Sequence, residues 1–212
     1  LAARWSGMDG YITNPEAGIK GPHLNDKQAR ISVAWRPAPA VTIDARFDIA
    51  RLRDKDTFAG QLLFCPPTGV ATSNNCTRAI NASGKTYGGE LTTHSTSLYG
   101  GLFNLDFEEA ALTAAVDLGP TALISTTAYQ NQRTDSRSNL TPIPALSLVG
   151  TKSYLSVQGP ERFRQFSQEL RVQSTQTGNL IDYLAGFYYE RSRLDVRGLT
   201  GFFFAPLGAA AA

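Results

Sequence analysis

The feature that most constrains this chain is a two-residue alternation of apolar and polar side chains. In residues 40–53 the odd positions hold Val41, Ile43, Ala45, Phe47 and Ile49. The even positions between them hold Thr42, Asp44, Arg46, Asp48 and Ala50. Because successive side chains of a strand point to opposite faces, this pattern predicts a β-strand with one apolar and one polar face.

The alternation recurs along the chain, so we predict an all-β, antiparallel fold with about seven long strands. The segments 108–118 and 121–134 alternate less clearly, because Ala and Thr fit either face. The expected strands are residues 1–9, 26–36, 40–53, 108–118, 121–134, 163–174 and 180–195.

The connections between these strands alternate between short and long. "PAPA", "GP" and "TQTG" are tight turns, whereas residues 10–25, 54–107 and 135–162 form the long joins. This layout is typical of an up-and-down transmembrane β-barrel, with short turns at one end and long loops at the other. At about 3.3 Å per residue and a tilt near 45°, about ten residues cross an apolar band of roughly 25 Å, which suits these strands.

The polar faces and the aromatic residues fit the same interpretation. Burying charges such as Asp44 and Asp48 in a sandwich core would cost several kcal/mol each unless they were paired, so we expect them to line a wet lumen. Trp35 and Tyr183 lie beside tight turns, as interfacial aromatic girdles require. The predicted lumen-facing residues are Arg30, Asp44, Arg46, Asp48, Glu169, Arg171, Asp182 and Glu190.

Composition excludes several other classes of protein. No stretch of 18 residues is free of charged or polar interruption, which excludes a spanning helix. A formal charge of +2 without a dense basic run argues against nucleic-acid binding. Cys65 and Cys76 close a polar loop, which predicts a disulfide; two unrelated free thiols are the alternative. Only two histidines, His23 and His94, are present, and both are isolated, so we expect no metal site.

The hairpin at 162–196 resembles a known family. "FRQFSQELRVQS", a short turn and "IDYLAGFYYER" resemble the barrel of TonB-dependent outer-membrane receptors. "LGPTALISTTAYQN" resembles an earlier hairpin of these barrels, and "DGYITN" resembles the top of a strand entering its loop.

The resemblance implies that residues 1–212 are part of a 22-stranded outer-membrane barrel, without its plug domain and closing strands. Such receptors take up an iron chelate, vitamin or oligosaccharide. The implied partners are outer-membrane lipid, the TonB energy-coupling protein acting through the missing plug region, and the small-molecule nutrient. The implied location is the cell outer membrane.

No catalytic constellation stands out, so we expect neither an enzyme nor a cofactor. Glu108 and Glu109 are adjacent and would point to opposite faces of a strand. A nutrient would bind in the long loops and the upper lumen, with the alternative that the candidate residues are loop filler. The candidates are Tyr11, Tyr87, His94, Tyr99, Arg133 and Arg137. Residues 97–107 fit a strand or a loop, and a secreted carbohydrate-binding or adhesion module is the competing function.

Overall fold

The computed structural model describes residues 1–14, 18–57, 100–139, 151–175 and 181–206, and these are all-β. They contain no helix long and apolar enough to cross a membrane. The strands are β1 (Ala2–Met8), β2 (Ile12–Asn14), β3 (Ile19–Gly21), β4 (His23–Ala38), β5 (Val41–Thr57), β6 (Gly101–Asp117), β7 (Thr121–Asn139), β8 (Thr151–Gln158), β9 (Glu161–Ser174), β10 (Leu184–Val196) and β11 (Leu199–Pro206).

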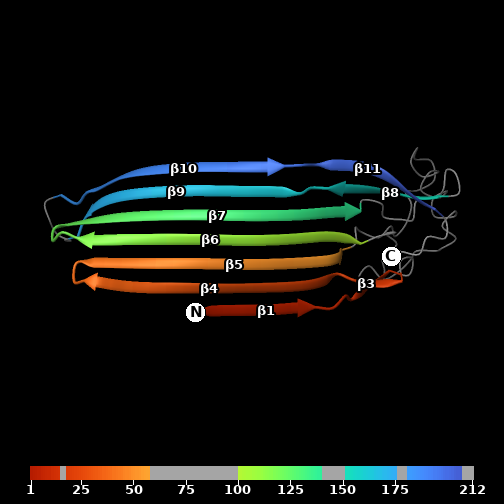
Figure 1. The fold of residues 1–212 in the computed structure, drawn as a ribbon, viewed down its shortest axis with the longest axis horizontal. Helices are drawn as coiled ribbons and strands as arrows, with labels where there is room; N and C mark the ends of the chain where they lie inside the picture. The colour runs from red at the N-terminus through yellow and green to blue at the C-terminus, as the bar shows by residue number, and fades with distance from the viewer. Residues whose placement is uncertain (15–17, 58–99, 140–150, 176–180, 207–212) are drawn as a thin grey trace.

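Nine of the strands form one antiparallel sheet (Figure 1). The path runs from β1 through β4, β5 and β6 to β7, which pairs with both β8 and β9; β10 and β11 then pair with β9 and β8. β2 and β3 form a separate small hairpin. The predicted antiparallel all-β fold is therefore confirmed, and the described strands form an open sheet with β1 at one edge.

The nine strands lie along seven continuous lines, because β8 runs into β9 and β10 into β11 without a change of register. Pro160 interrupts the line formed by β8 and β9, since proline has no N–H to donate to the ladder. The Gly159 N–H nevertheless donates to the Ser136 carbonyl (2.8 Å), and the Arg197 N–H donates to the Pro160 carbonyl (3.0 Å). These lines correspond to the seven long strands expected from the sequence.

Several strand boundaries differ from the prediction. β5 extends to Thr57 and β6 begins at Gly101, so residues 54–57 and 101–107 of the predicted join at 54–107 are strand, and residues 58–99 lie outside the described part of the chain. β7 and β8 occupy parts of the predicted join at 135–162, and β10 begins at Leu184 instead of residue 180. The added ends of β5 and β7 carry polar side chains on both faces, whereas residues 101–107 place the apolar Phe103, Leu105 and Phe107 on one face. The backbone ladder needs no apolar alternation to form.

The described turns that join β4 to β5 and β6 to β7 lie at one end of the sheet (Figure 1). Between β6 and β7, the Leu118 N–H donates to the Thr121 carbonyl (2.8 Å), and the Gly119 N–H donates to Asp117 Oδ1 (2.9 Å). Gly119 has φ +88°, a left-handed conformation that favours glycine. We refer to this end as the turn end and to the opposite end as the loop end.

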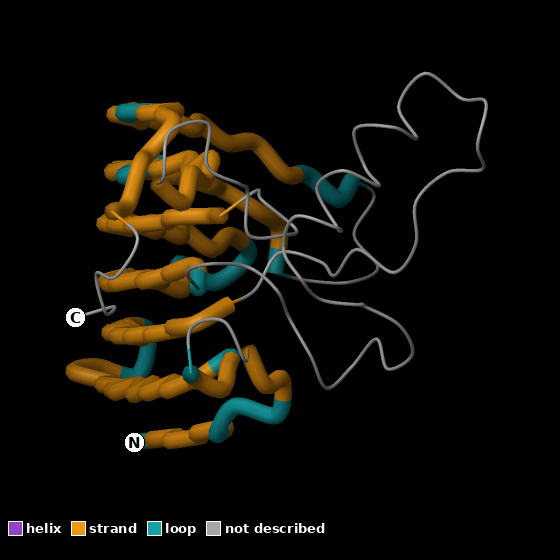
Figure 2. The backbone as a smooth tube through the Cα atoms, turned by 90° about the vertical axis from the view of Figure 1, so that its right-hand side faces the viewer, coloured by secondary structure: helices purple, strands orange, loops and turns teal. Residues whose placement is uncertain are grey.

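The described part of the chain has no hydrophobic core. Its only buried positions are Asn14, Gly21, Gly101 and Ser156, and the long strands form a single layer (Figure 2). Trp35 is 59% exposed and Phe187 is 64% exposed. No second sheet among the described residues covers these apolar side chains.

Candidate functional site

The strand register divides the side chains of the sheet into two faces. Residues directly opposite one another in an antiparallel pair point to the same side. Phe47 shares its face with Ile31, Ala110, Tyr129 and Phe166. Asp48 shares the other face with Arg30, Glu109, Gln130 and Gln165. We call these the Phe47 face and the Asp48 face.

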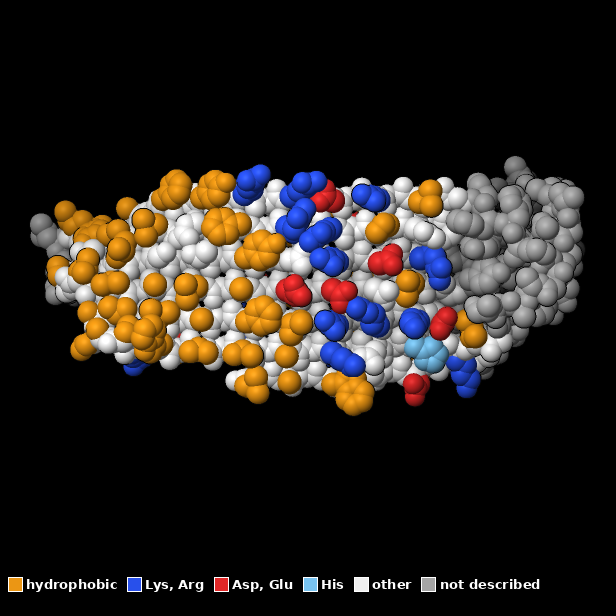
Figure 3. Space-filling model, in the orientation of Figure 1, with side chains coloured by type: hydrophobic (Ala, Val, Ile, Leu, Met, Phe, Trp, Pro, Cys, Tyr) orange, Lys and Arg blue, Asp and Glu red, His pale blue; other side chains and the backbone are white. Residues whose placement is uncertain are grey.

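The half of the Phe47 face near the turn end is apolar, and we call it the apolar band (Figure 3). Among the described residues of β4, β5, β6, β7 and β9, this band contains no charged side chain. Three of its polar side chains, Ser125, Thr127 and Gln168, hydrogen-bond to one another, with Thr127 Oγ1 donating to Gln168 Oε1 (2.5 Å) and Gln168 Nε2 donating to Ser125 Oγ (2.9 Å). Its main members are Ile31, Val33, Trp35, Ile43, Ala45, Phe47, Leu112, Ala114, Leu123, Tyr129, Phe166, Leu170, Val172, Phe187 and Tyr189.

The half of the Phe47 face near the loop end is charged (Figure 3). One register row reads Lys27, Arg51, Asp106, Arg133, Arg162, Asp195 across six strands. Cations outnumber carboxylates, so this surface is basic. The charged band comprises Lys27, Arg51, Arg53, Lys55, Asp106, Glu108, Arg133, Asp135, Arg137, Arg162, Arg164, Arg191, Arg193 and Asp195.

Two carboxylates of the charged band each hold two arginines. Asp106 Oδ1 lies 2.6 Å from Arg53 Nη2 and 3.8 Å from Arg51 Nε. Asp195 lies 3.0 Å from Arg193 Nη2 and 3.3 Å from Arg164 Nη2. In this charged half of β10, beyond the apolar band, the hydrogen bond from Arg193, together with the charges of Arg193 and Arg164, lowers the pKa of the Asp195 carboxyl.

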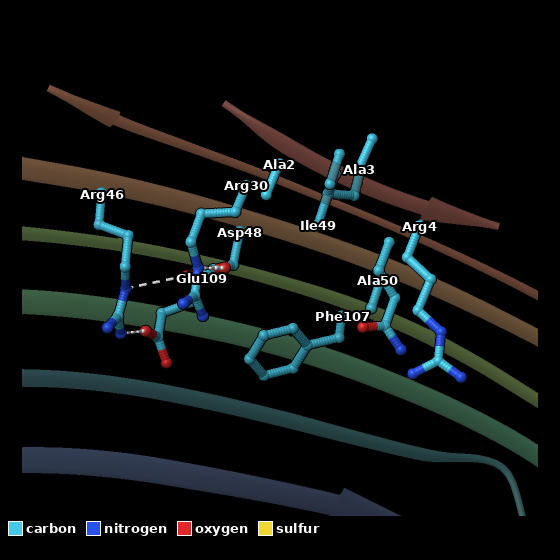
Figure 4. A pocket seen from close by; sticks show the side chains of 12 residues that line it. Ala2, Ala3, Arg4, Arg30, Arg46, Asp48, Ile49, Ala50, Phe107 and Glu109 are labelled. Carbon is cyan, nitrogen blue, oxygen red and sulfur yellow. Dashed lines mark hydrogen bonds and ion pairs between the residues drawn. The ribbon is translucent and has the colours of Figure 1, made fainter.

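The Asp48 face carries an ion-pair network near the middle of the sheet (Figure 4). The Arg30 Nε–H donates to Asp48 Oδ1 (2.5 Å), and Arg46 Nε lies 2.9 Å from Asp48 Oδ2. Arg46 also pairs with Glu109. The network links β4, β5 and β6, and its carboxylates are neutralised by guanidinium groups. It makes this face hydrophilic and offers no unpaired acid and base for catalysis.

The sidedness of the sheet reverses towards the loop end. Where the Phe47 face becomes charged, the Asp48 face gains apolar side chains on β5, β6, β9 and β10, while on β4 and β7 it stays mostly polar. The apolar residues there are Leu52, Phe103, Leu105, Phe107, Phe163, Leu194 and Val196. β5, β6, β9 and β10 therefore carry apolar side chains on opposite faces in their two halves.

The residues predicted to line a lumen fall largely on one face. Arg30, Asp44, Arg46, Asp48, Glu169, Arg171 and Glu190 share the Asp48 face. Asp182 precedes β10 and accepts a hydrogen bond from Ser174 Oγ (3.4 Å). The register thus brings together side chains from distant segments, as the alternation predicts.

The predicted ligand-binding residues are placed differently from expectation. Arg133 lies in the predicted strand 121–134, whereas Arg137 falls in the predicted join 135–162; both lie in β7 on the Phe47 face, because the ladder continues through this polar segment. Tyr11 is exposed between β1 and β2. Tyr87, His94, Tyr99 and the predicted Cys65–Cys76 disulfide lie outside the described residues. Within the described residues, no cluster of three His, Cys, Asp or Glu could hold a metal ion.

The arrangement that sequence reasoning missed is the charged band. Its members lie on several strands and become neighbours only through the register, so no local motif reveals them. Comparisons with protein-family models, curated proteins and solved structures find no match to this chain.

Proposed function

We propose that this chain is part of the transmembrane β-barrel of an outer-membrane receptor that takes up a scarce nutrient. The observation that carries the membrane location is the exposed apolar band on the Phe47 face, opposite the ion-pair network on the Asp48 face. A barrel strand in a bilayer alternates in this way, with apolar side chains towards lipid and polar side chains towards the lumen. The receptor class and its TonB coupling rest on the resemblance of residues 162–196.

Strand length supports a bilayer location. β4, β5, β6 and β7 have 16, 17, 17 and 19 residues, more than the roughly ten that a tilted strand needs to cross the apolar band of a bilayer. The additional residues project past the apolar band at the loop end. They carry the charged band, which is the chemistry expected beyond a membrane surface.

The border between the apolar and charged bands also slants across the sheet. Counted from the turn end, the first charged side chain on the Phe47 face is Arg51 on β5 and Arg191 on β10. The residue of β10 in the same row as Arg51 is Asp195, so the border on β10 lies four residues nearer the turn end. At ~3.3 Å per residue and ~4.8 Å per strand, the border shifts by roughly 13 Å over roughly 19 Å, a slope of about 35°. A flat membrane surface crossing strands tilted by ~35–45° would produce this slope.

The competing function, a secreted carbohydrate-binding or adhesion module, would need the apolar band to be covered by protein. Val33 is 55% exposed, and Trp35 and Phe187 are more exposed still. Contiguous apolar patches of this kind are rare on soluble monomers. Lipid is the simpler covering, and closure of a barrel would pair the two open edges of the sheet with further strands.

The membrane location is tested by quenching of tryptophan fluorescence with brominated lipid chains. A Trp5→Phe variant, which leaves Trp35 as the sole tryptophan, should be quenched strongly in vesicles of brominated phosphatidylcholine. The matched control adds Trp35→Phe and Ala34→Trp, which moves the indole to the Asp48 face, and should be quenched much less. A chain that stays monomeric in buffer, with Trp35 insensitive to the brominated lipid, would contradict the proposal.

The receptor role is tested separately on the protein inserted in vesicles. Iron chelates, cobalamin and oligosaccharides are titrated as candidate nutrients, with binding followed by calorimetry. We expect saturable binding of one of these classes. Insertion without binding of any of them would refute the receptor role and leave the membrane location intact.

A further inference from the structure

The charged band contains three pairs of cations that lie directly opposite one another on adjacent strands. They are Lys27 and Arg51, Arg133 and Arg162, and Arg164 and Arg193. Like charges in directly opposite positions destabilise a sheet. A sheet that repeats this arrangement three times on one surface is suited to binding an anion there.

The Arg133–Arg162 pair is the one that the described residues leave without a counter-charge. Arg51 reaches Asp106, and Arg164 and Arg193 share Asp195. In the register, Asp106 lies opposite Arg133 and Asp195 lies opposite Arg162, yet both carboxylates pair with other arginines. Among the described residues neither Arg133 nor Arg162 forms an ion pair, and Arg162 Nε is buried without a hydrogen-bond partner.

The position of this pair indicates what the anion is. On the same two strands, Tyr129 and Phe166 lie opposite one another at the edge of the apolar band. Asn131 and Arg164 form the next row on this face, and Arg133 and Arg162 the row after that, roughly 13 Å along the strand from the aromatic pair. Aromatic side chains gather at the membrane interface, and the headgroup layer lies just beyond it.

We propose that Arg133 and Arg162, with Arg164 beside them, bind the phosphate group of a lipid headgroup in the leaflet at the loop end. This site rests on the proposed membrane location. Planar guanidinium groups match the geometry of phosphate oxygens and hold them with charge-assisted hydrogen bonds. A bound phosphate would also screen the repulsion between the two opposed arginines, so lipid binding and strand pairing stabilise each other.

The site is tested with the protein inserted in phosphatidylcholine vesicles that contain spin-labelled phosphatidic acid or spin-labelled phosphatidylcholine. The motionally restricted fraction of each label gives the preference of the protein for the anionic lipid. The unaltered protein should prefer phosphatidic acid, and Arg133→Gln/Arg162→Gln should lower this preference by roughly fivefold or more. The matched control, Arg4→Gln/Arg171→Gln, removes the same charge from the Asp48 face and should leave the preference unchanged.

The outcomes separate this site from the proposed function. An unchanged preference in Arg133→Gln/Arg162→Gln, or an equal loss in the control, would refute the site. Competition by inorganic phosphate, compared with chloride at equal ionic strength, should be weak; full displacement of the lipid would show a site for free phosphate instead. Failure to insert into phosphatidylcholine would refute the membrane location and the site together, whereas insertion without headgroup preference would refute the site alone.

Discussion

The proposed membrane location makes a quantitative prediction for a charge introduced on the apolar band. Leu112 lies opposite Ala45 on β5 and Thr127 on β7, in the middle of the band, and is 47% exposed. An arginine on the lipid-facing side of a barrel costs about 2–4 kcal/mol at the bilayer midplane and about 0–1 kcal/mol near the interface. We therefore expect Leu112→Arg to lower the free energy of unfolding by about 2–4 kcal/mol.

Depth within the band and choice of face supply the controls. Ile49 lies four residues nearer the loop end, opposite Glu108, so Ile49→Arg places its charge at the border and should cost about 0–1 kcal/mol. Thr113 is adjacent to Leu112 but lies on the Asp48 face opposite Asp44, so Thr113→Arg should cost less than about 1 kcal/mol. Leu112→Arg and Thr113→Arg thus introduce the same charge at neighbouring positions on opposite faces of β6.

The measurement is reversible denaturant unfolding of the protein folded in phospholipid vesicles, followed by tryptophan fluorescence. The order of costs should be Leu112→Arg well above Ile49→Arg and Thr113→Arg. Equal costs at Leu112 and Ile49 would show that the band has no depth dependence. Equal costs at Leu112 and Thr113 would show that both faces meet the same environment, and either result would refute the reasoning.

Two further predictions concern the turn and the ion-pair network. Gly119→Ala should lower the free energy of unfolding by about 1 kcal/mol because Gly119 has φ +88°. The control Gly198→Ala should have little effect, because an added Cβ there meets open space and φ is not positive. Denaturant unfolding of each variant measures both effects. Asp48→Asn should cost about 1–3 kcal/mol because Asp48 holds two arginines, while Asp44→Asn, on the same face without an ion pair to a described residue, should cost less. Equal effects at Asp48 and Asp44 would show that the network contributes nothing measurable to stability.

The two faces of β5 were predictable from the sequence alone. Side chains alternate along any strand, so Phe47 and Asp48 had to point to opposite sides once the segment was strand. The extent of the strands was less accessible, because the ends of β5 and β7 carry polar side chains on both faces and the start of β6 has its apolar side chains on the face opposite to those in the rest of the strand. β8 and β11 were missed because nothing in their sequence shows that they continue β9 and β10 past Pro160 and Gly198.

The candidate lipid site could not be predicted from the sequence. Arg133 and Arg162 are separated by a long connection, and only the register places them opposite one another. A shift of the pairing by one residue would move one of the two arginines to the other face. Ion-pair partners were equally inaccessible, since Asp106 pairs with Arg53 and Arg51, on the neighbouring β5, in preference to Arg133, which lies opposite it on β7.

The reversal of sidedness along β5, β6, β9 and β10 supports the proposed membrane barrel over a soluble sandwich. A strand of a sandwich keeps one face on the core along its length. On β5 the apolar side chains leave the Phe47 face after Ile49 and reappear on the Asp48 face at Leu52, while Arg51 and Arg53 take over the Phe47 face. The surroundings of the Phe47 face must therefore change from apolar to aqueous within about two residues, or roughly 7 Å. In the proposed membrane location, the edge of a bilayer would provide so abrupt a change, and its slant across β5 to β10 would follow from the tilt of the strands.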